Sequence, residues 1–274
     1  MTDVNKFFDK IFIINLEDNV SRFEKVQKQF KRRKIDVERF LAIDGRCKYD
    51  KTRQKKLCLD KLNNFKIKYG INYKLSASDK KRLGQIVPAS SLTLGTILLL
   101  RRMVKEKWKR ILICEDDIEL TKNFTTEFKK GVKELGERRW DLLYLGVGGE
   151  AGLKGVSWTK DRHHRYTSPW DENGDMGYVH NKNDLRMPVY DEDSNEVKAI
   201  SDSLTKVTYP GGNWCYAYSL SGAKKILKII DNNILEHIDQ IIMQNGKKIN
   251  SIAFDPPIVY HENIRGGRNT DIPW

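Results

Sequence analysis

Cysteine is scarce in this chain of 274 residues, and no pair of cysteines has the spacing of a zinc site or a redox motif. The four cysteines are Cys47, Cys58, Cys114 and Cys215. None is close in sequence to another cysteine or to a histidine. We therefore expect reduced thiols, and we exclude a small fold that depends on disulfides or zinc.

Long hydrophobic runs are also missing. The longest apolar stretch, residues 92–100, is about half of what a membrane span requires. Residues 1–9 include Asp3 and Asp9 and lack the apolar centre of a secretory signal. We therefore expect an intracellular protein without a signal peptide or transmembrane segment, either soluble or attached peripherally to a membrane.

Acidic residues are few in the first part of the chain. The net charge is +13 overall, and residues 1–110 carry 29 Lys and Arg against 12 Asp and Glu, whereas the remainder carries 21 against 25. Such a field attracts a nucleotide diphosphate, an anionic glycan, a membrane surface or a nucleic acid, and charge does not choose among them. A merely solubilising lysine-rich surface is the simplest alternative.

Hydrophobic periodicity indicates an α/β fold. Apolar runs rich in β-branched residues predict buried strands at residues 11–16, 110–114 and 141–146. Apolar residues at helical spacing predict helices over residues 91–108 and 238–244, among others. We expect a Rossmann-like mixed sheet flanked by helices, with ligands bound beyond the carboxyl ends of the strands.

We interpret residues 1–274 as one domain. Residues 46–90 are rich in Lys, Asn and Ser with weak periodicity, which is typical of a peripheral insertion. Residues 147–210 are rich in Gly, Asp and Trp, and we interpret them as a variable segment on the acceptor side.

Three consecutive carboxylates, Glu115-Asp116-Asp117, follow the strand at residues 110–114. Like charges at this spacing repel one another and require a cation or basic partners. Carboxylate oxygens suit Mn²⁺ or Mg²⁺, which commonly bridge protein carboxylates to phosphate oxygens. The alternative is an acidic loop or an acidic helix N-terminus, where the helix dipole favours Asp and Glu.

Several sequence blocks occur in a recognisable order: Ile13-Ile14-Asn15-Leu16 with Ser21-Arg22, Ala42-Ile43-Asp44-Gly45, Leu92-Thr93-Leu94-Gly95, Leu112-Ile113-Cys114-Glu115-Asp116-Asp117, Trp140-Asp141-Leu142-Leu143-Tyr144-Leu145-Gly146, Tyr216-Ala217-Tyr218-Ser219 with Gly222-Ala223-Lys224-Lys225, Ile238-Asp239 and Pro256-Pro257-Ile258-Val259. In these blocks the chain resembles glycosyltransferase family 25, which includes lipooligosaccharide and procollagen galactosyltransferases. It departs from the family where Gly95-Thr96 replaces a Gly-Glu pair and no Ser-His follows.

The resemblance implies a GT-A type fold, a UDP-sugar donor and inversion at the anomeric carbon. Inversion requires a base that takes the proton of the acceptor hydroxyl, and we predict Asp239 for this role, with a helix N-cap as the alternative. We predict that Glu115, Asp117 and His261 bind Mn²⁺ or Mg²⁺, although a hydrogen-bonded structural histidine is the simpler interpretation of His261.

The residues expected to bind the donor are Asn15, Leu16, Arg22, Asp44 and Asp116. Arg22 offers a planar fork for phosphate, with a solvated surface charge as its alternative, and Asp44 can hold a ribose or uracil group or simply support the turn at Gly45. Gly211-Gly212-Asn213-Trp214 suits packing against a sugar ring, although a turn before a core Trp is simpler.

The sequence therefore predicts a metal-dependent inverting glycosyltransferase that moves galactose or glucose from a UDP-sugar to a hydroxyl of a glycan, glycolipid or hydroxylysine-type protein acceptor. We expect no specific nucleic-acid partner, while contact with a membrane through the basic N-terminal half stays open. The alternatives are a metal-dependent nuclease or nucleotidyltransferase, and a glycan-binding relative without catalysis.

Overall fold

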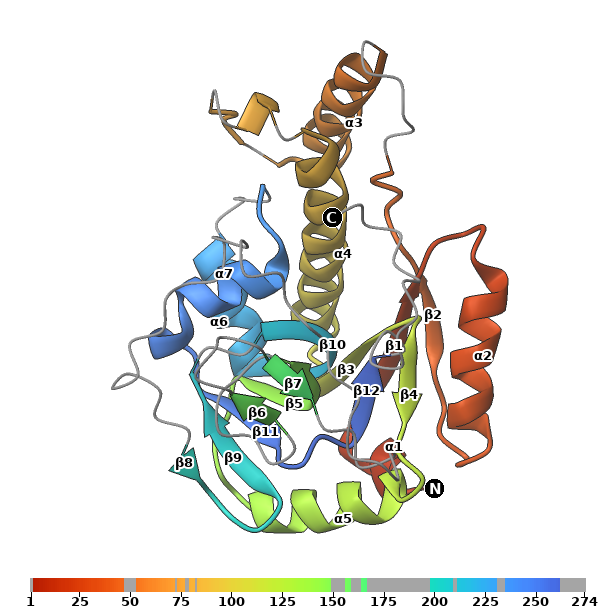
Figure 1. Ribbon diagram of the computed structural model, residues 1–274, viewed down its shortest axis with the longest axis vertical. Helices are drawn as coiled ribbons and strands as arrows, with labels where there is room; N and C mark the ends of the chain where they lie inside the picture. The colour runs from red at the N-terminus through yellow and green to blue at the C-terminus, as the bar shows by residue number, and fades with distance from the viewer. Residues whose placement is uncertain are drawn as a thin grey trace.

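The computed structural model describes residues 2–46, 53–71, 73–76, 79–81, 83–148, 156–158, 164–166, 198–208, 211–230 and 235–261 (Figure 1). Most of the predicted variable segment, residues 147–210, lies outside these ranges, as does part of the predicted insertion at residues 46–90. The interpretation of the chain as a single domain stays a prediction.

The main sheet is mixed. Its strands are β1 (Lys10–Asn15), β2 (Glu38–Leu41), β3 (Arg110–Glu115), β5 (Leu142–Gly148), β8 (Lys198–Ala199), β9 (Leu204–Val207), β10 (Gly211–Ser219) and β11 (Ser251–Phe254). They are hydrogen-bonded in the order β2-β1-β3-β10-β5-β11-β9-β8. β1 is parallel to β2 and β3, whereas β10 is antiparallel to β3 and β5. The carboxyl ends of β1, β2 and β3 therefore lie at one edge of the sheet.

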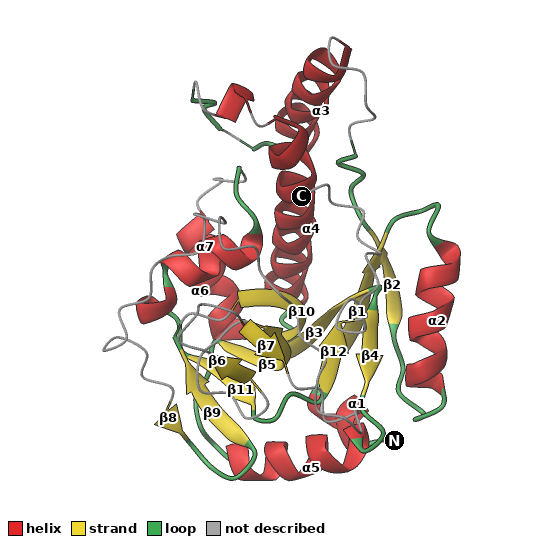
Figure 2. Ribbon diagram, in the orientation of Figure 1, coloured by secondary structure: helices red, strands yellow, loops and turns green. Residues whose placement is uncertain are grey.

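Helices cover the sheet (Figure 2). They are α1 (Asp3–Phe7), α2 (Val20–Lys31), α3 (Arg53–Tyr69), α4 (Leu83–Glu106), α5 (Phe124–Leu135), α6 (Leu220–Ile230) and α7 (Ile238–Gln244), with single 3₁₀ turns at η1 (Asp79–Lys81) and η3 (Gly246–Lys248). The predicted α/β class, a Rossmann-like mixed sheet flanked by helices, is confirmed.

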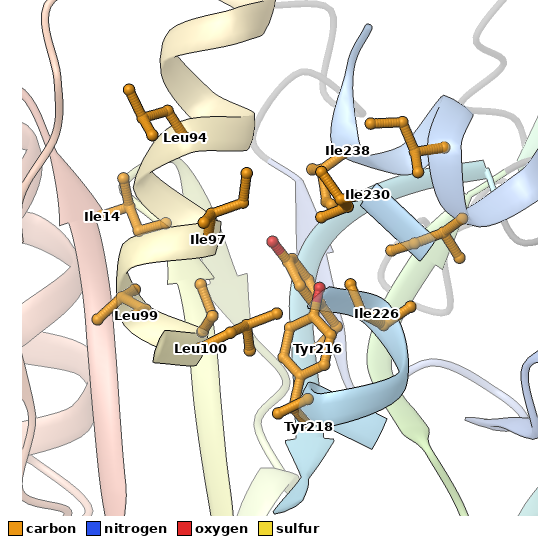
Figure 3. Packing of buried hydrophobic residues seen from close by; sticks show 14 of the residues in the cluster. Ile14, Leu94, Ile97, Leu99, Leu100, Tyr216, Tyr218, Ile226, Ile230 and Ile238 are labelled. Carbon is orange, nitrogen blue, oxygen red and sulfur yellow. The ribbon is translucent and has the colours of Figure 1, made fainter. Parts of the chain in front are cut away.

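Successive side chains of the central strands point to opposite faces of the sheet, and both sets are apolar, so helices cover both faces. Phe12 and Ile14 of β1 belong to a core cluster with α4, α6 and α7, and Figure 3 shows Ile14 beside the apolar residues of α4. Ile11 and Ile13 point to the other face, in a cluster with residues of α2 and α5. A strand buried on both faces has no polar side, which is why the sequence is continuously apolar there.

Helix α4 begins earlier than the sequence predicts. We expected a start at residue 91, yet the helix begins at Leu83 and includes Pro88. Tertiary packing overrides the proline here. A Cβ atom at Gly45 would lie 2.3 Å from Ser91 Oγ and 2.7 Å from Pro88 Cα, so the backbone at Gly45 sits directly on this part of α4.

By length and composition, residues Ile86–Glu106 of α4 could cross a membrane, but 78% of the apolar window in this stretch is buried against the rest of the protein. A core helix gives the same signal. The described residues therefore contain no clear transmembrane segment.

Two further pairs of strands lie outside the main sheet. β6 (Val156–Trp158) pairs with β7 (His164–Tyr166), and β4 (Ile118–Leu120) pairs antiparallel with β12 (Val259–His261), with His261 opposite Ile118. The second pair brings the C-terminal part of the described chain to the end of β3.

The prediction of reduced thiols is wrong for Cys58 on α3, which is disulfide-bonded, and its partner lies outside the described residues. Cys114 and Cys215 are free and buried, with their sulfur atoms 3.4 Å apart on neighbouring strands. Sequence spacing did not reveal the disulfide, because such a bond depends on two Cα atoms lying about 4 to 7 Å apart in the fold.

Candidate active site

The acidic run lies at the carboxyl edge of the sheet, as the sequence predicts. Glu115 is the last residue of β3, and Asp116 and Asp117 form the turn into β4. Asp117 is only 6% exposed. A short turn between two strands thus places three carboxyl groups side by side, two of them largely shielded from water.

Arg22 supplies the positive charge that these carboxylates require. Its Nη2 atom lies 2.9 Å from Asp116 Oδ1 and 2.7 Å from Asp117 Oδ2. Arg22 stands in the first turn of α2, directly after the loop that follows β1. The alternative interpretation, a solvated surface charge, is wrong because the Arg22 side chain is only 14% exposed.

Asn15 joins the first strand to the acidic run. Its Nδ2 atom donates to Asp116 Oδ2 at 2.6 Å and to the Asn19 carbonyl at 2.8 Å. The amide oxygen of Asn15 accepts from Arg39 Nε at 2.8 Å, and Arg39 Nη2 also donates to the Leu16 carbonyl at 2.9 Å. Arg39 therefore fixes which end of the Asn15 amide faces Asp116.

His261 completes a group that could hold a divalent cation. Its Nε2 atom lies 3.1 Å from Asp117 Oδ2 and 3.9 Å from Glu115 Oε2. One potential ligand atom from each of these three residues lies within 4.8 Å of the other two. The structure thus brings the three predicted metal ligands together.

The chemistry of this group suits a cation. Asp117 Oδ1 is buried and has no hydrogen-bond partner among the described residues. Such an unsatisfied carboxylate oxygen is costly unless something positive binds it. Two carboxylates and one imidazole are donors that Mn²⁺ accepts readily, and they also suit Mg²⁺ through their oxygens.

The pKa of Glu115 is raised well above its ordinary value. Burial of the carboxyl group is the largest cause, followed by the charges of Asp117, Asp116 and Asp239, while Arg22 acts in the opposite direction. The Glu115 side chain as a whole is 31% exposed. Excess negative charge therefore remains after Arg22 has paired.

Asp239, the predicted base, belongs to the same charged group, since its charge contributes to the raised pKa of Glu115. It is the second residue of α7, and the N-cap of this helix is His237, so the N-cap interpretation of Asp239 is wrong. Asp239 Oδ1 accepts from the Gln240 backbone N–H at 2.8 Å. The side chain is partly exposed.

Tyr216 of β10 lies beside these carboxyl groups. Its pKa is raised by burial, and the charges of Glu115 and Asp239 raise it further. The side chain of Thr96 on α4 acts in the opposite direction and lowers that pKa. Thr96 is the position where the chain departs from the family pattern, so the departure lies close to Tyr216.

Asp44 lies on the loop after β2, apart from the acidic run. Its Oδ1 atom lies 3.0 Å from Arg46 Nε and 3.8 Å from Lys61 Nζ. Arg46 also contacts Asp18 of the loop after β1, with 2.8 Å between Nη2 and Oδ2. The loops after β1 and β2 therefore meet at the same edge of the sheet as the acidic run.

The indole of Trp214 lies beside the imidazole of His261, and the prediction that it packs against a sugar ring stays a prediction. Its ring centroid lies 5.6 Å from that of His261, and a Cβ atom at Gly146 would lie 2.4 Å from Trp214 Nε1. The absence of a side chain at Gly146 therefore provides the space that the Trp214 indole occupies next to the His261 imidazole.

Sequence reasoning missed Arg39, Arg46, Lys61 and Tyr216. In the sequence, Tyr216 is one residue of an apolar strand block, and Arg39 lies in a strand of ordinary alternating polarity. The available signal was topological: β1 and β2 are parallel neighbours, so residues near their carboxyl ends lie together.

The comparisons with known proteins identify the family of the chain. The family model described as "Glycosyltransferase family 25 (LPS biosynthesis protein)" matches residues 8–242. Proteins named "Glycosyltransferase 25 family member" from Aedes aegypti and Drosophila pseudoobscura pseudoobscura are 30% identical over 141 residues and 29% identical over 143 residues. Each match covers 50% of this chain but only 21% and 20% of the relatives, so the matched half of the chain spans about a fifth of their length.

Among solved structures, the chain is similar to mouse xyloside xylosyltransferase 1 in its apo form, with a TM-score of 0.34 and 11% sequence identity over 88% of this chain and 70% of that one. The assignment does not depend on this similarity. Because the family model extends over most of the sequence, the chain belongs to glycosyltransferase family 25, which confirms the resemblance that its sequence blocks indicated.

Proposed function

We propose that this protein is a metal-dependent, inverting glycosyltransferase of the GT-A type, which transfers a hexose from a UDP-sugar to a hydroxyl group of an acceptor. The observation that carries the proposal is the group formed by Glu115, Asp117 and His261 at the carboxyl edge of the sheet. Ligands of open α/β sheets bind at this edge.

Glu115, Asp117 and His261 would hold Mn²⁺ or Mg²⁺, and the unpartnered Asp117 Oδ1 fits such an ion. When bound, the ion supplies Lewis-acid stabilisation of the charge that develops on the UDP leaving group. Arg22, between Asp116 and Asp117, is placed to contribute a second positive charge for the diphosphate.

The nucleoside of the donor belongs at the carboxyl ends of β1 and β2. Asn15 and Leu16 end the first strand, and the loop at Asp44 meets the loop after β1 through the contact between Arg46 and Asp18. Arg46 and Lys61 lie next to Asp44. Asp44 could therefore accept from a ribose hydroxyl while the two cations attract the phosphates of the same nucleotide.

Asp239 is our candidate base. In an inverting transfer, the acceptor oxygen forms the new bond to the anomeric carbon while the bond to the UDP oxygen breaks on the opposite face. Asp239 would take the hydroxyl proton, and UDP would leave with the bonding electron pair. Asp239 lies on α7 and not on the turn that holds Asp116 and Asp117, so the base and the proposed metal ligands come from different elements.

The acceptor that we propose is a glycan or glycolipid, because the family description mentions LPS biosynthesis, or a hydroxylysine-type protein. Thr96 and Tyr216 contact each other beside Glu115 and Asp239, so we propose that this pair helps to select the sugar.

The test is a screen of UDP-glucose, UDP-galactose and UDP-N-acetylglucosamine with Mn²⁺, in which UDP release is measured. We expect release with one hexose donor and none for Asp117→Asn. Asp60→Asn on α3 makes the same chemical change on an exposed surface and should leave the rate unchanged. No turnover of any donor, together with no thermal shift by UDP and Mn²⁺, would exclude the transferase; a thermal shift without turnover would indicate a binding protein.

A further inference from the structure

The predicted insertion holds most of the excess positive charge of the molecule. Residues 46–90 contain 13 Lys and Arg against 3 Asp and Glu, whereas the rest of the chain contains 37 against 34. A solubilising surface needs no such concentration in one segment. The nucleotide site described above uses only Arg46 and Lys61 of this segment.

Five of the described lysines of this segment are exposed, whereas Lys61 is partly buried. The five are Lys56, Lys66, Lys68, Lys74 and Lys80. Within the described ranges, none of them forms an ion pair with a carboxylate. By contrast, Lys129 and Lys130 of α5 lie 3.7 Å from Asp3 and 3.8 Å from Glu134.

Helix α3 also exposes large apolar side chains among these charges. Ile67 is 82% exposed, the largest value among the large hydrophobic residues that the structure describes, and Leu57 is 42% exposed. The opposite face of α3 buries Leu62 and Phe65 in the core cluster with α4. Ile67 therefore does not belong to the apolar face by which α3 packs on the rest of the protein.

Figure 1 shows that α3 projects at one end of the molecule, beyond the edge where the loop after β2 leaves the sheet, while α5 lies at the opposite end. Lys61 of α3 donates to the carbonyls of Asp44 and Arg46 at 2.9 Å and 2.8 Å. The projection is thus attached to the edge of the sheet that carries the candidate active site.

We propose that α3, with the lysines at residues 74 and 80, docks the protein onto an anionic phospholipid bilayer. Lysines attract the negative surface, and an exposed Ile67 between Lys66 and Lys68 can enter the boundary between headgroups and acyl chains. A polynucleotide matches the charge but offers no apolar layer for Ile67. This docking is independent of the proposed transferase activity.

The test uses the full chain and co-sedimentation with vesicles of phosphatidylcholine mixed with phosphatidylglycerol, beside vesicles of phosphatidylcholine alone. We expect binding only to the anionic vesicles, and weaker binding as salt is raised. Each lysine near such a surface contributes about 1 kcal/mol, or roughly fivefold in affinity, so Lys56→Gln/Lys66→Gln/Lys68→Gln should weaken binding on the order of a hundredfold. Ile67→Ser should weaken it by about tenfold while the net charge stays the same.

The matched control is Lys129→Gln/Lys130→Gln/Lys133→Gln, which removes three charges from α5. It should bind the anionic vesicles as the unchanged protein does. Equal loss in both triple variants, equal binding to both vesicle types, or no effect of Ile67→Ser would overturn the proposal. So would tighter binding to duplex RNA than to the anionic vesicles at the same salt. Thermal unfolding of each variant verifies that these surface changes leave the fold intact.

Discussion

Replacing Asp117 by Asn separates a metal site from a structural network of ion pairs. Removing one partner of a buried ion pair ordinarily costs about 3 to 5 kcal/mol. Here Arg22 keeps Asp116 at 2.9 Å, the Asn carbonyl can still accept from Arg22, and repulsion from Glu115 and Asp116 is relieved. We therefore expect the metal-free free energy of unfolding to change by less than about 1 kcal/mol.

The same substitution should remove stabilisation by metal. At a Mn²⁺ concentration about 100-fold above its dissociation constant, binding adds roughly 2.7 kcal/mol to the stability of the folded protein. For a chain of this size, that corresponds to a rise in melting temperature of about 5 to 10 °C. We expect this rise in the unchanged protein and in the control Asp60→Asn, and none in Asp117→Asn.

The assay is urea and thermal unfolding after dialysis against a chelator, with and without Mn²⁺. A loss of several kcal/mol in metal-free Asp117→Asn, with no Mn²⁺-dependent shift in the unchanged protein, would refute the reasoning. The acidic run would then be a structural ion-pair network that Arg22 completes.

Three further outcomes follow from the site. Asp239→Asn should lower kcat by about 10² to 10⁴ while the KM for the donor changes little, and a retained rate in steady-state kinetics would remove Asp239 as the base. Arg39→Gln should raise the donor KM or weaken Mn²⁺ binding by about tenfold, because the amide of Asn15 loses the group that orients it; an unchanged KM and thermal shift would contradict this. Without metal, the free energy of unfolding should fall as pH rises from the unfolded pKa of Glu115 through its raised folded pKa, because in this range the folded state still holds the proton and the unfolded state has lost it. Urea unfolding across this pH range should show the decline, and the Glu115→Gln variant should not.

The elements that the sequence identifies best are those whose burial is simplest. β1, β3 and β5 are apolar on both faces, and α7 was predicted at its observed bounds, residues 238–244. The start of α4 was missed because Pro88 favours a helix boundary, whereas the backbone of Gly45 packs on this turn from a distant part of the chain. The conformational preferences of the residues around Pro88 give no information about this contact with Gly45.

The candidate site shows the same division. The acidic run and its place after a buried strand could be read directly from residues 110–117. That His261 lies 3.1 Å from Asp117 depends on the pairing of β12 with β4, across a separation of more than a hundred residues. Arg39 was missed because its importance comes from the parallel pairing of β1 with β2, and not from any pattern around it.

Helix α4 contacts both the proposed nucleotide-binding part and the proposed acceptor-binding part of the site. The loop that carries Asp44 rests on its early turns through Gly45, and Thr93 Oγ1 donates to the Glu236 carbonyl at 2.7 Å, just before the helix that carries Asp239. Its next turn places Thr96 against Tyr216. The proposed nucleotide and acceptor sides of the site therefore both pack on helix α4, and a small shift of this helix along its axis would move both sides together.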